Sequence, residues 1–286
     1  MSATASPLRY RRPFTILWGA LYLISLALTI WTDFPVEVGL YVILGLGIPL
    51  TVLMSMEWST RLPGRKIALW LVMAGAAWWL ASAVLIRAEY EWRLWGTVNT
   101  LTLLLVTFTI GYWLAGEVER VGHLIPVSIL GTLVDIWSVF RGPSKSVGEQ
   151  VAEHAQRQAE TGVWQPPPFV ELLLLNWPQP GAPYMTPVFG FGDLVFIALF
   201  VAGSRRFGLS LVKNVLLLLA GLAVAVVLAF LYGPMPALPF ICGFFLLGNL
   251  RSLSMTRKEW QATVLICLAV LVVGFLTYLR SMVPAE

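Results

Sequence analysis

Charged and metal-binding side chains are scarce in this sequence. Only 12% of its 286 residues are charged, and it holds just two histidines and two cysteines. Both cysteines, Cys242 and Cys267, lie in apolar segments, where they form neither a disulfide framework nor a metal-ligand spacing. No nucleotide, flavin or haem motif is present, so we expect neither a cofactor nor a metal ion.

Apolar residues are abundant instead. Hydrophobic residues make up 58% of the sequence, whereas soluble domains reach about 45–50% even with glycine counted. Nine segments are candidate transmembrane helices, which need roughly 17–25 residues each. They are 14–32, 38–55, 67–86, 97–115, 124–140, 187–203, 211–232, 236–250 and 260–279. The sequence therefore predicts an all-α polytopic membrane protein with about nine transmembrane helices.

The predicted spans fall into three regions. An N-terminal four-helix membrane region covers 1–123, and a C-terminal helix lies within 251–286. The central membrane region, 124–250, contains the long extramembrane loop 141–186. Because the other connections are short and no repeat is visible, we expect no separate soluble domain.

The basic residues predict the orientation of the chain. Thirteen of the 19 Lys and Arg residues fall on the side of the N-terminus, in the stretches 9–12, 61–66, 205–213 and 251–258 and at Arg120. The positive-inside rule then places the N-terminus in the cytoplasm and the C-terminus outside. The net charge of +4 is therefore explained by topology and does not indicate a nucleic-acid partner.

Two of the three aspartates stand inside predicted spans. Asp135 lies five residues before the end of its span and Asp193 six residues after the start of its span, so both flank the 141–186 loop. At 1.5 Å per residue, each lies about 8 Å below the same membrane face. A carboxylate at membrane depth costs roughly 2.5–3.5 kcal/mol, which favours a role in a site or an ion path.

Neighbouring carboxyl groups away from bulk water can share one proton, because burial and like-charge repulsion both disfavour the second charge. Such a pair supplies a base to activate water and an acid to protonate a carbonyl or a leaving amine. The alternatives are polar residues satisfied by a neighbouring helix, or groups on a proton path. Transport sites usually recruit further polar partners, and the candidates Asn99, Asn214 and Asn249 lie only near span ends.

Two short motifs follow Asp135 in order. The first is GxGD, formed by Gly190, Phe191, Gly192 and Asp193, and the second is PAL, formed by Pro236, Ala237 and Leu238. Together with Asp135 they resemble the motifs of the presenilin and signal peptide peptidase family of intramembrane aspartyl proteases. The stretch DIWSVFRGPSKSVGEQVAEHAQ, which begins at Asp135, is similar to the presenilin branch. The resemblance covers 124–250.

The resemblance implies a presenilin-like helical bundle that hydrolyses peptide bonds inside the membrane. Asp135 and Asp193 would be the catalytic pair, the PAL residues would support the active site, and the substrate would be a transmembrane protein or peptide within the lipid bilayer. The sequence departs from the family at Val134, where the family commonly has tyrosine, in having four spans before the Asp135 helix instead of five, and in the added span at 260–279. The alternatives are a prepilin-peptidase-like GxGD protease, a proton-coupled transporter or channel, and a catalytically silent scaffold.

The 141–186 loop carries two further expectations. Val147, Val151 and Ala155 recur at helical spacing and predict a short helix on the membrane surface. The apolar run FVELLLLNW, residues 169–177, follows three prolines and is too short to span the membrane. We favour an interfacial helix for this run. The alternative is an extended strand whose edge pairs with an unwound substrate segment.

Overall fold

The computed structural model describes residues 12–31, 33–60, 65–85, 92–141, 172–182, 185–233 and 235–281, together with Gln150, Glu153, Gln156 and Arg157. The surface helix expected around 147–155 lies almost entirely outside the described residues. The helices are α1 (Pro13–Leu28), α2 (Val36–Val42), the π-helical η1 (Ile43–Gly47), α3 (Ile48–Trp58), α4 (Arg65–Leu85), α5 (Trp92–Glu117), the 3-10 helix η2 (Val121–His123), α6 (Leu124–Arg141), α8 (Phe191–Arg206), α9 (Leu211–Tyr232), α10 (Leu238–Asn249) and α11 (Arg257–Ser281).

The prediction of a mostly helical membrane protein is confirmed. Within the described residues, four helical stretches are long and apolar enough to cross a membrane: Val36–Trp58, Trp95–Glu117, Val121–Phe140 and Leu211–Tyr232. Shorter apolar helices lie at Pro13–Leu28, Lys66–Leu80 and Leu238–Asn249. These features indicate a multi-pass membrane protein, and nine crossings remain a prediction.

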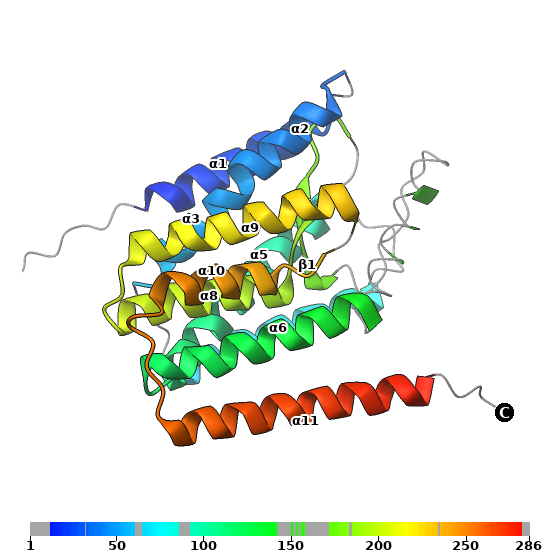
Figure 1. Ribbon diagram of the computed structural model, residues 1–286. Helices are drawn as coiled ribbons and strands as arrows, with labels where there is room; N and C mark the ends of the chain where they lie inside the picture. Colours follow the sequence, from blue (N-terminus) through cyan, green and yellow to red (C-terminus); the bar gives the residue numbers. More distant parts are fainter. Residues whose placement is uncertain are drawn as a thin grey trace, which may run out of the picture.

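Helix α8 lies at the centre of the bundle. Almost every side chain from Leu194 to Ser204 is buried, which is typical of a helix that is covered on all sides. Its closest neighbour is α5, whose backbone approaches at Gly111: a Cβ atom there would lie only 2.5 Å from the Val195 carbonyl oxygen. Figure 1 shows α6, α8, α9 and α10 running alongside one another, with α11 along α6.

Two antiparallel strands stand at one end of the bundle, near the label β1 in Figure 1. Strand β1 (Leu174–Pro178) pairs with β2 (Met185–Gly190), with an irregularity between Leu175 and Asn176. The interfacial-helix interpretation of FVELLLLNW is therefore wrong for its last four residues, which form a strand as the alternative predicted. The span expected at 187–203 also begins as a strand and becomes helical only at Phe191. The description "all-α" thus omits a β-hairpin.

Helices α1 and α5 hold β1 in place. The Trp177 ring is fully buried and packs edge-on against Trp18 and Tyr22 of α1. From α5, the Asn99 side-chain amide donates to the Leu172 carbonyl at 3.2 Å, and the Thr100 hydroxyl donates to the Asn176 carbonyl at 2.8 Å. These contacts explain why an apolar run that could have formed a helix is extended, since burial and pairing override local preference.

Candidate active site

Helices α6 and α8 carry Asp135 and Asp193. They contact each other one helical turn further into the bundle than these aspartates. A Cβ atom on Gly131 of α6 would lie 2.2 Å from the ring of Phe196 on α8, so the missing side chain admits that ring. Asp135 lies four residues after Gly131, and Asp193 lies three residues before Phe196. Because residues three or four apart share one face of a helix, this contact brings both carboxyl groups to one level.

Asp135 binds the N-terminus of α10. The Leu238 backbone N–H donates to Asp135 Oδ2 at 2.9 Å, and the Ala237 N–H also reaches this carboxylate. The first N–H groups of a helix have no partner within the helix and carry its positive dipole end. Pro236 and Pro239 have no N–H, so the donors that the PAL segment offers here are those of Ala237 and Leu238. The PAL segment therefore contacts Asp135 through backbone N–H groups.

Asp193 is held by the start of its own helix. Its Oδ2 accepts the Gly190 N–H at 3.1 Å, which is the return half of a capping box. A Cβ atom on Gly190 would stand 3.3 Å from this oxygen, so glycine leaves room for the bent-back carboxylate. Phe191 packs edge-on against Trp79 of α4, with 6.2 Å between ring centroids.

The three sequence motifs thus converge. The Asp135 and Asp193 carboxyl groups are close enough for their charges to interact, and both side chains are half-buried. Leu238 links the motifs, because its N–H binds Asp135 while its Cδ1 lies 4.0 Å from where a Cβ on Gly192 would stand. Val134, the position that departs from the family pattern, is 53% exposed.

Sequence reasoning missed a polar row beside the pair. The buried Cys242 thiol, one turn after Leu238 on α10, lies near the hydroxyls of Thr132 and Ser128 and near both aspartates. The two hydroxyl residues lie three and seven positions before Asp135. That spacing was a usable signal, since it places all three polar side chains on one face of α6.

A second polar cluster ties the helices at the opposite end of the bundle. The Asn249 amide donates to Asn214 Oδ1 at 2.7 Å, and the Asn214 amide donates to the Ser204 hydroxyl at 2.8 Å. All three residues are buried, and they come from α10, α9 and α8. Between this cluster and the aspartates, the rings of Phe200 and Phe245 stack with 4.2 Å between centroids. Asn214 and Asn249, two of the three asparagines considered from the sequence, therefore lie apart from the carboxyl pair.

The described residues also bear on metal binding. Among them, no three His, Cys, Asp or Glu side chains lie together as a metal site requires. The carboxyl pair is surrounded by backbone N–H donors, hydroxyls and a thiol. This arrangement suits acid and base chemistry between two carboxyl groups.

Comparison with known proteins adds no family assignment. No protein-family model, no curated protein and no solved structure matches this chain. The family resemblance of Asp135, GxGD and PAL therefore remains a prediction.

Proposed function

We propose that this chain is an intramembrane aspartyl endopeptidase that cleaves peptide bonds within transmembrane segments. The observation that carries the proposal is the convergence of Asp135, Asp193 and the Leu238 N–H from three separate helices. Buried acidic pairs are costly in a membrane and are kept where they do chemistry or move ions. The order of Asp135, GxGD and PAL along the chain favours catalysis over ion movement.

The proposed reaction is hydrolysis by a carboxyl pair that shares one proton. The unprotonated carboxylate removes a proton from water as the water oxygen attacks the peptide carbonyl carbon, and the protonated carboxyl gives its proton to the carbonyl oxygen. The resulting diol collapses as one of its hydroxyls gives its proton to the carboxylate that is now unprotonated, the C–N bond breaks, and the amine nitrogen takes a proton from the other carboxyl, so the pair again holds one proton. Leu238 and Gly190 each donate to an Oδ2 atom, and in the proposed reaction the Oδ1 atoms contact water and substrate.

The hairpin offers a place for an unwound substrate. The outer edge of β1 is covered by α5, through Asn99 and Thr100, so this edge is not available as the sequence suggested. Strand β2 is the other member of the two-stranded sheet that the described residues form, and it leads through Gly190 directly to Asp193. We propose that a substrate strand adds to the outer edge of β2, where main-chain pairing requires little sequence specificity.

The proposed orientation follows from charge and topology. Helix α1 begins at one end of the bundle and α11 ends at the other, as Figure 1 shows. With the N-terminus in the cytoplasm, the 141–186 loop and the hairpin lie on the outer side. The least buried of the four long helices is α6, whose outer face includes Trp137 and Phe140. A substrate helix would reach the carboxyl pair laterally beside this face.

A proton-coupled transporter is the rival function. It would use the same aspartates but needs a polar route through the bundle. The stacked Phe200 and Phe245 rings separate the pair from the Ser204 cluster, which favours the protease.

The test is mass spectrometry of single-span peptides incubated in lipid with the wild type and with Asp135→Asn or Asp193→Asn. We expect cleavage inside the span by the wild type and by neither of these two variants. Asp33→Asn is the matched control, because Asp33 is the third aspartate of the chain and is exposed. Cleavage that survives both catalytic-site variants, or proton flux without any cleavage, would overturn the proposal.

A further inference from the structure

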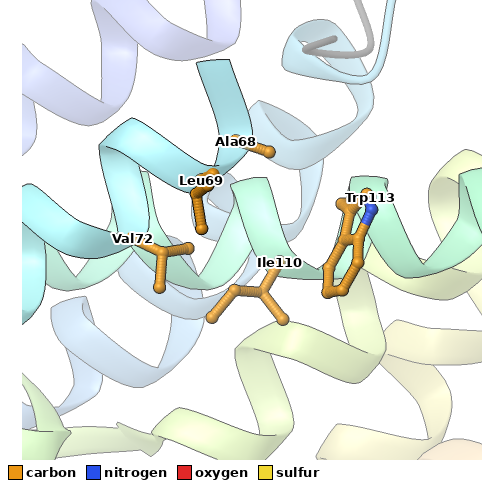
Figure 2. A pocket seen from close by; sticks show the side chains of 5 residues that line it. All are labelled: Ala68, Leu69, Val72, Ile110 and Trp113. Carbon is orange, nitrogen blue, oxygen red and sulfur yellow. The ribbon is translucent and has the colours of Figure 1, made fainter. Parts of the chain in front are cut away.

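The apolar groove in Figure 2 is one place where an unwound transmembrane segment could rest. It lies between α4 and α5 and is lined by Ala68, Leu69, Val72, Ile110 and Trp113. An unwound segment needs partners for its backbone N–H and C=O groups, because lipid supplies none. The indole N–H of Trp113 is the one polar side-chain group of this lining, and it already donates to Glu117. The outer edge of β2, which carries backbone groups, suits such a segment better.

Pro187 determines which backbone groups β2 turns outward. Opposed residues in an antiparallel ladder exchange either two N–H···O bonds or none. Pro187 has no N–H, so its pair with Asn176 is of the second kind. The Thr100 hydroxyl of α5 donates to the Asn176 carbonyl on the far side of β1, which agrees with this assignment. The Pro187 carbonyl therefore points to the outer edge of β2.

Met185 also faces outward, two residues before Pro187. Its partner Pro178 has no N–H either, so this pair too exchanges no hydrogen bonds. The Met185 N–H and carbonyl therefore both point to the outer edge. Pro187 is exposed, and no group among the described residues hydrogen-bonds to its carbonyl. This stretch of the edge thus presents two acceptors and one donor.

The regular edge ends at Pro187. Val188 is the extra residue of the irregularity between the strands and lies outside the regular ladder. The Gly190 N–H donates to Asp193, and the Gly190 carbonyl, at the N-cap of α8, accepts the first hydrogen bond of that helix. A substrate strand therefore meets its last regular partner before it reaches the carboxyl pair.

We propose that Pro187 makes this edge select substrate strands by their backbone N–H groups. The inference rests on the proposed function and specifies its substrates. In either strand direction, the substrate donates two N–H groups, from residues two apart, to the carbonyls of Met185 and Pro187. It needs one acceptor, for the Met185 N–H. A transmembrane segment with proline at either donating position is rejected, because proline has no N–H to give.

The wild-type protein tests the substrate side of this inference. A single-span peptide with a mapped cleavage site is methylated at one backbone nitrogen at a time, and initial cleavage rates are measured in vesicles. We expect two positions, two residues apart, to lose about threefold to tenfold in rate, which is the size of one net hydrogen bond. Methylation of the residue between them should leave the rate unchanged, since its N–H points away from β2.

Pro187→Ala tests the protein side. It adds an N–H to the outer edge, so KM should fall about threefold to tenfold while kcat stays within about twofold. Pro178→Ala is the matched control, because it adds an N–H to the edge of β1 that points away from β2. KM should not change in this control. A proline that only protects an edge strand from pairing with other chains would instead give dimers on substitution.

The outcomes separate this inference from the proposed function. Equal effects of methylation at all positions, an unchanged KM in Pro187→Ala, or dimers without a change in KM would overturn the inference and leave the carboxyl pair as the proposed catalyst. The methylation series needs only the wild type, so it decides the inference even if Pro187→Ala fails to fold. Absence of any cleavage by the wild type would overturn the proposed function, and this inference with it.

Discussion

The backbone N–H of Leu238 donates to Asp135 Oδ2 at 2.9 Å, across 103 residues of sequence. This bond fixes one carboxylate of the proposed catalytic pair to the positive end of α10. It also gives the PAL segment a physical role, because prolines on both sides limit which N–H groups can reach the carboxylate. Because backbone N–H groups hold both carboxylates, we expect substitution of the nearby glycines to affect the site.

Gly190→Ala should lower proteolysis more than Gly192→Ala. A Cβ atom at Gly190 would stand 3.3 Å from Asp193 Oδ2 and displace the carboxylate, whereas a Cβ at Gly192 would make an ordinary 4.0 Å contact with Leu238. Misplacement of a reacting group by about 1 Å can cost on the order of 100-fold in rate. Initial cleavage rates in lipid would measure both variants. Equal losses would contradict the capping role of Gly190.

Gly131→Ala should separate α6 from α8, because its Cβ would overlap the Phe196 ring. We expect destabilisation of about 1–3 kcal/mol, the usual cost of overpacking, and a lower cleavage rate. The double variant Gly131→Ala/Phe196→Leu should recover much of both losses. Thermal unfolding of the four proteins in one detergent would give the coupling energy, and strict additivity would show that the two residues do not set the helix spacing.

Asn214→Leu should destabilise the bundle without changing the chemistry of the aspartates. It leaves the buried Asn249 amide and the Ser204 hydroxyl without this partner, at a cost of about 1–3 kcal/mol. Thermal unfolding and single-turnover cleavage would separate the two effects. Leu216→Ala is a useful comparison, because Leu216 is 61% exposed on the same helix and the substitution keeps an apolar side chain there. A changed pH dependence of cleavage in Asn214→Leu would argue that this cluster serves the reaction.

Low pH should loosen the start of α11. The Thr256 backbone N–H donates to Glu259 Oε2 at 2.7 Å and lowers the pKa of this carboxyl, with help from the Thr256 hydroxyl, His123 and Arg120. A lowered pKa means that the contact stabilises the fold above the ordinary glutamate pKa of about 4.3 and is lost as pH falls through the lowered value.

Pepsin cleavage of the 250–256 segment, followed from about pH 5 down to about pH 2.5, would measure this loosening. Glu259→Gln should be cleaved faster than wild type at the upper end and converge with it at the lower end. Parallel curves over the whole range would contradict the role of the charge.

Helix positions could be predicted from the sequence because apolar length is a local property. The depth match of Asp135 and Asp193 could also be predicted, since it needs only the rise per residue. The hairpin could not, because the extended state of Leu174–Pro178 depends on β2 and on α5, which are distant in sequence. The hydrogen bond from the Leu238 N–H to Asp135 could not be predicted either, since almost every residue type has a backbone N–H.

The separation between Leu238 and Asp135 has a consequence for biosynthesis. A ribosome delivers α6 and α8 to the membrane well before α10, so during this interval Asp135 lacks its donor from Leu238. An unfinished chain would therefore hold both acids without the N-terminus of α10 that orients one of them. The proposed catalytic pair would therefore be complete only after α10 (Leu238–Asn249) has entered the membrane.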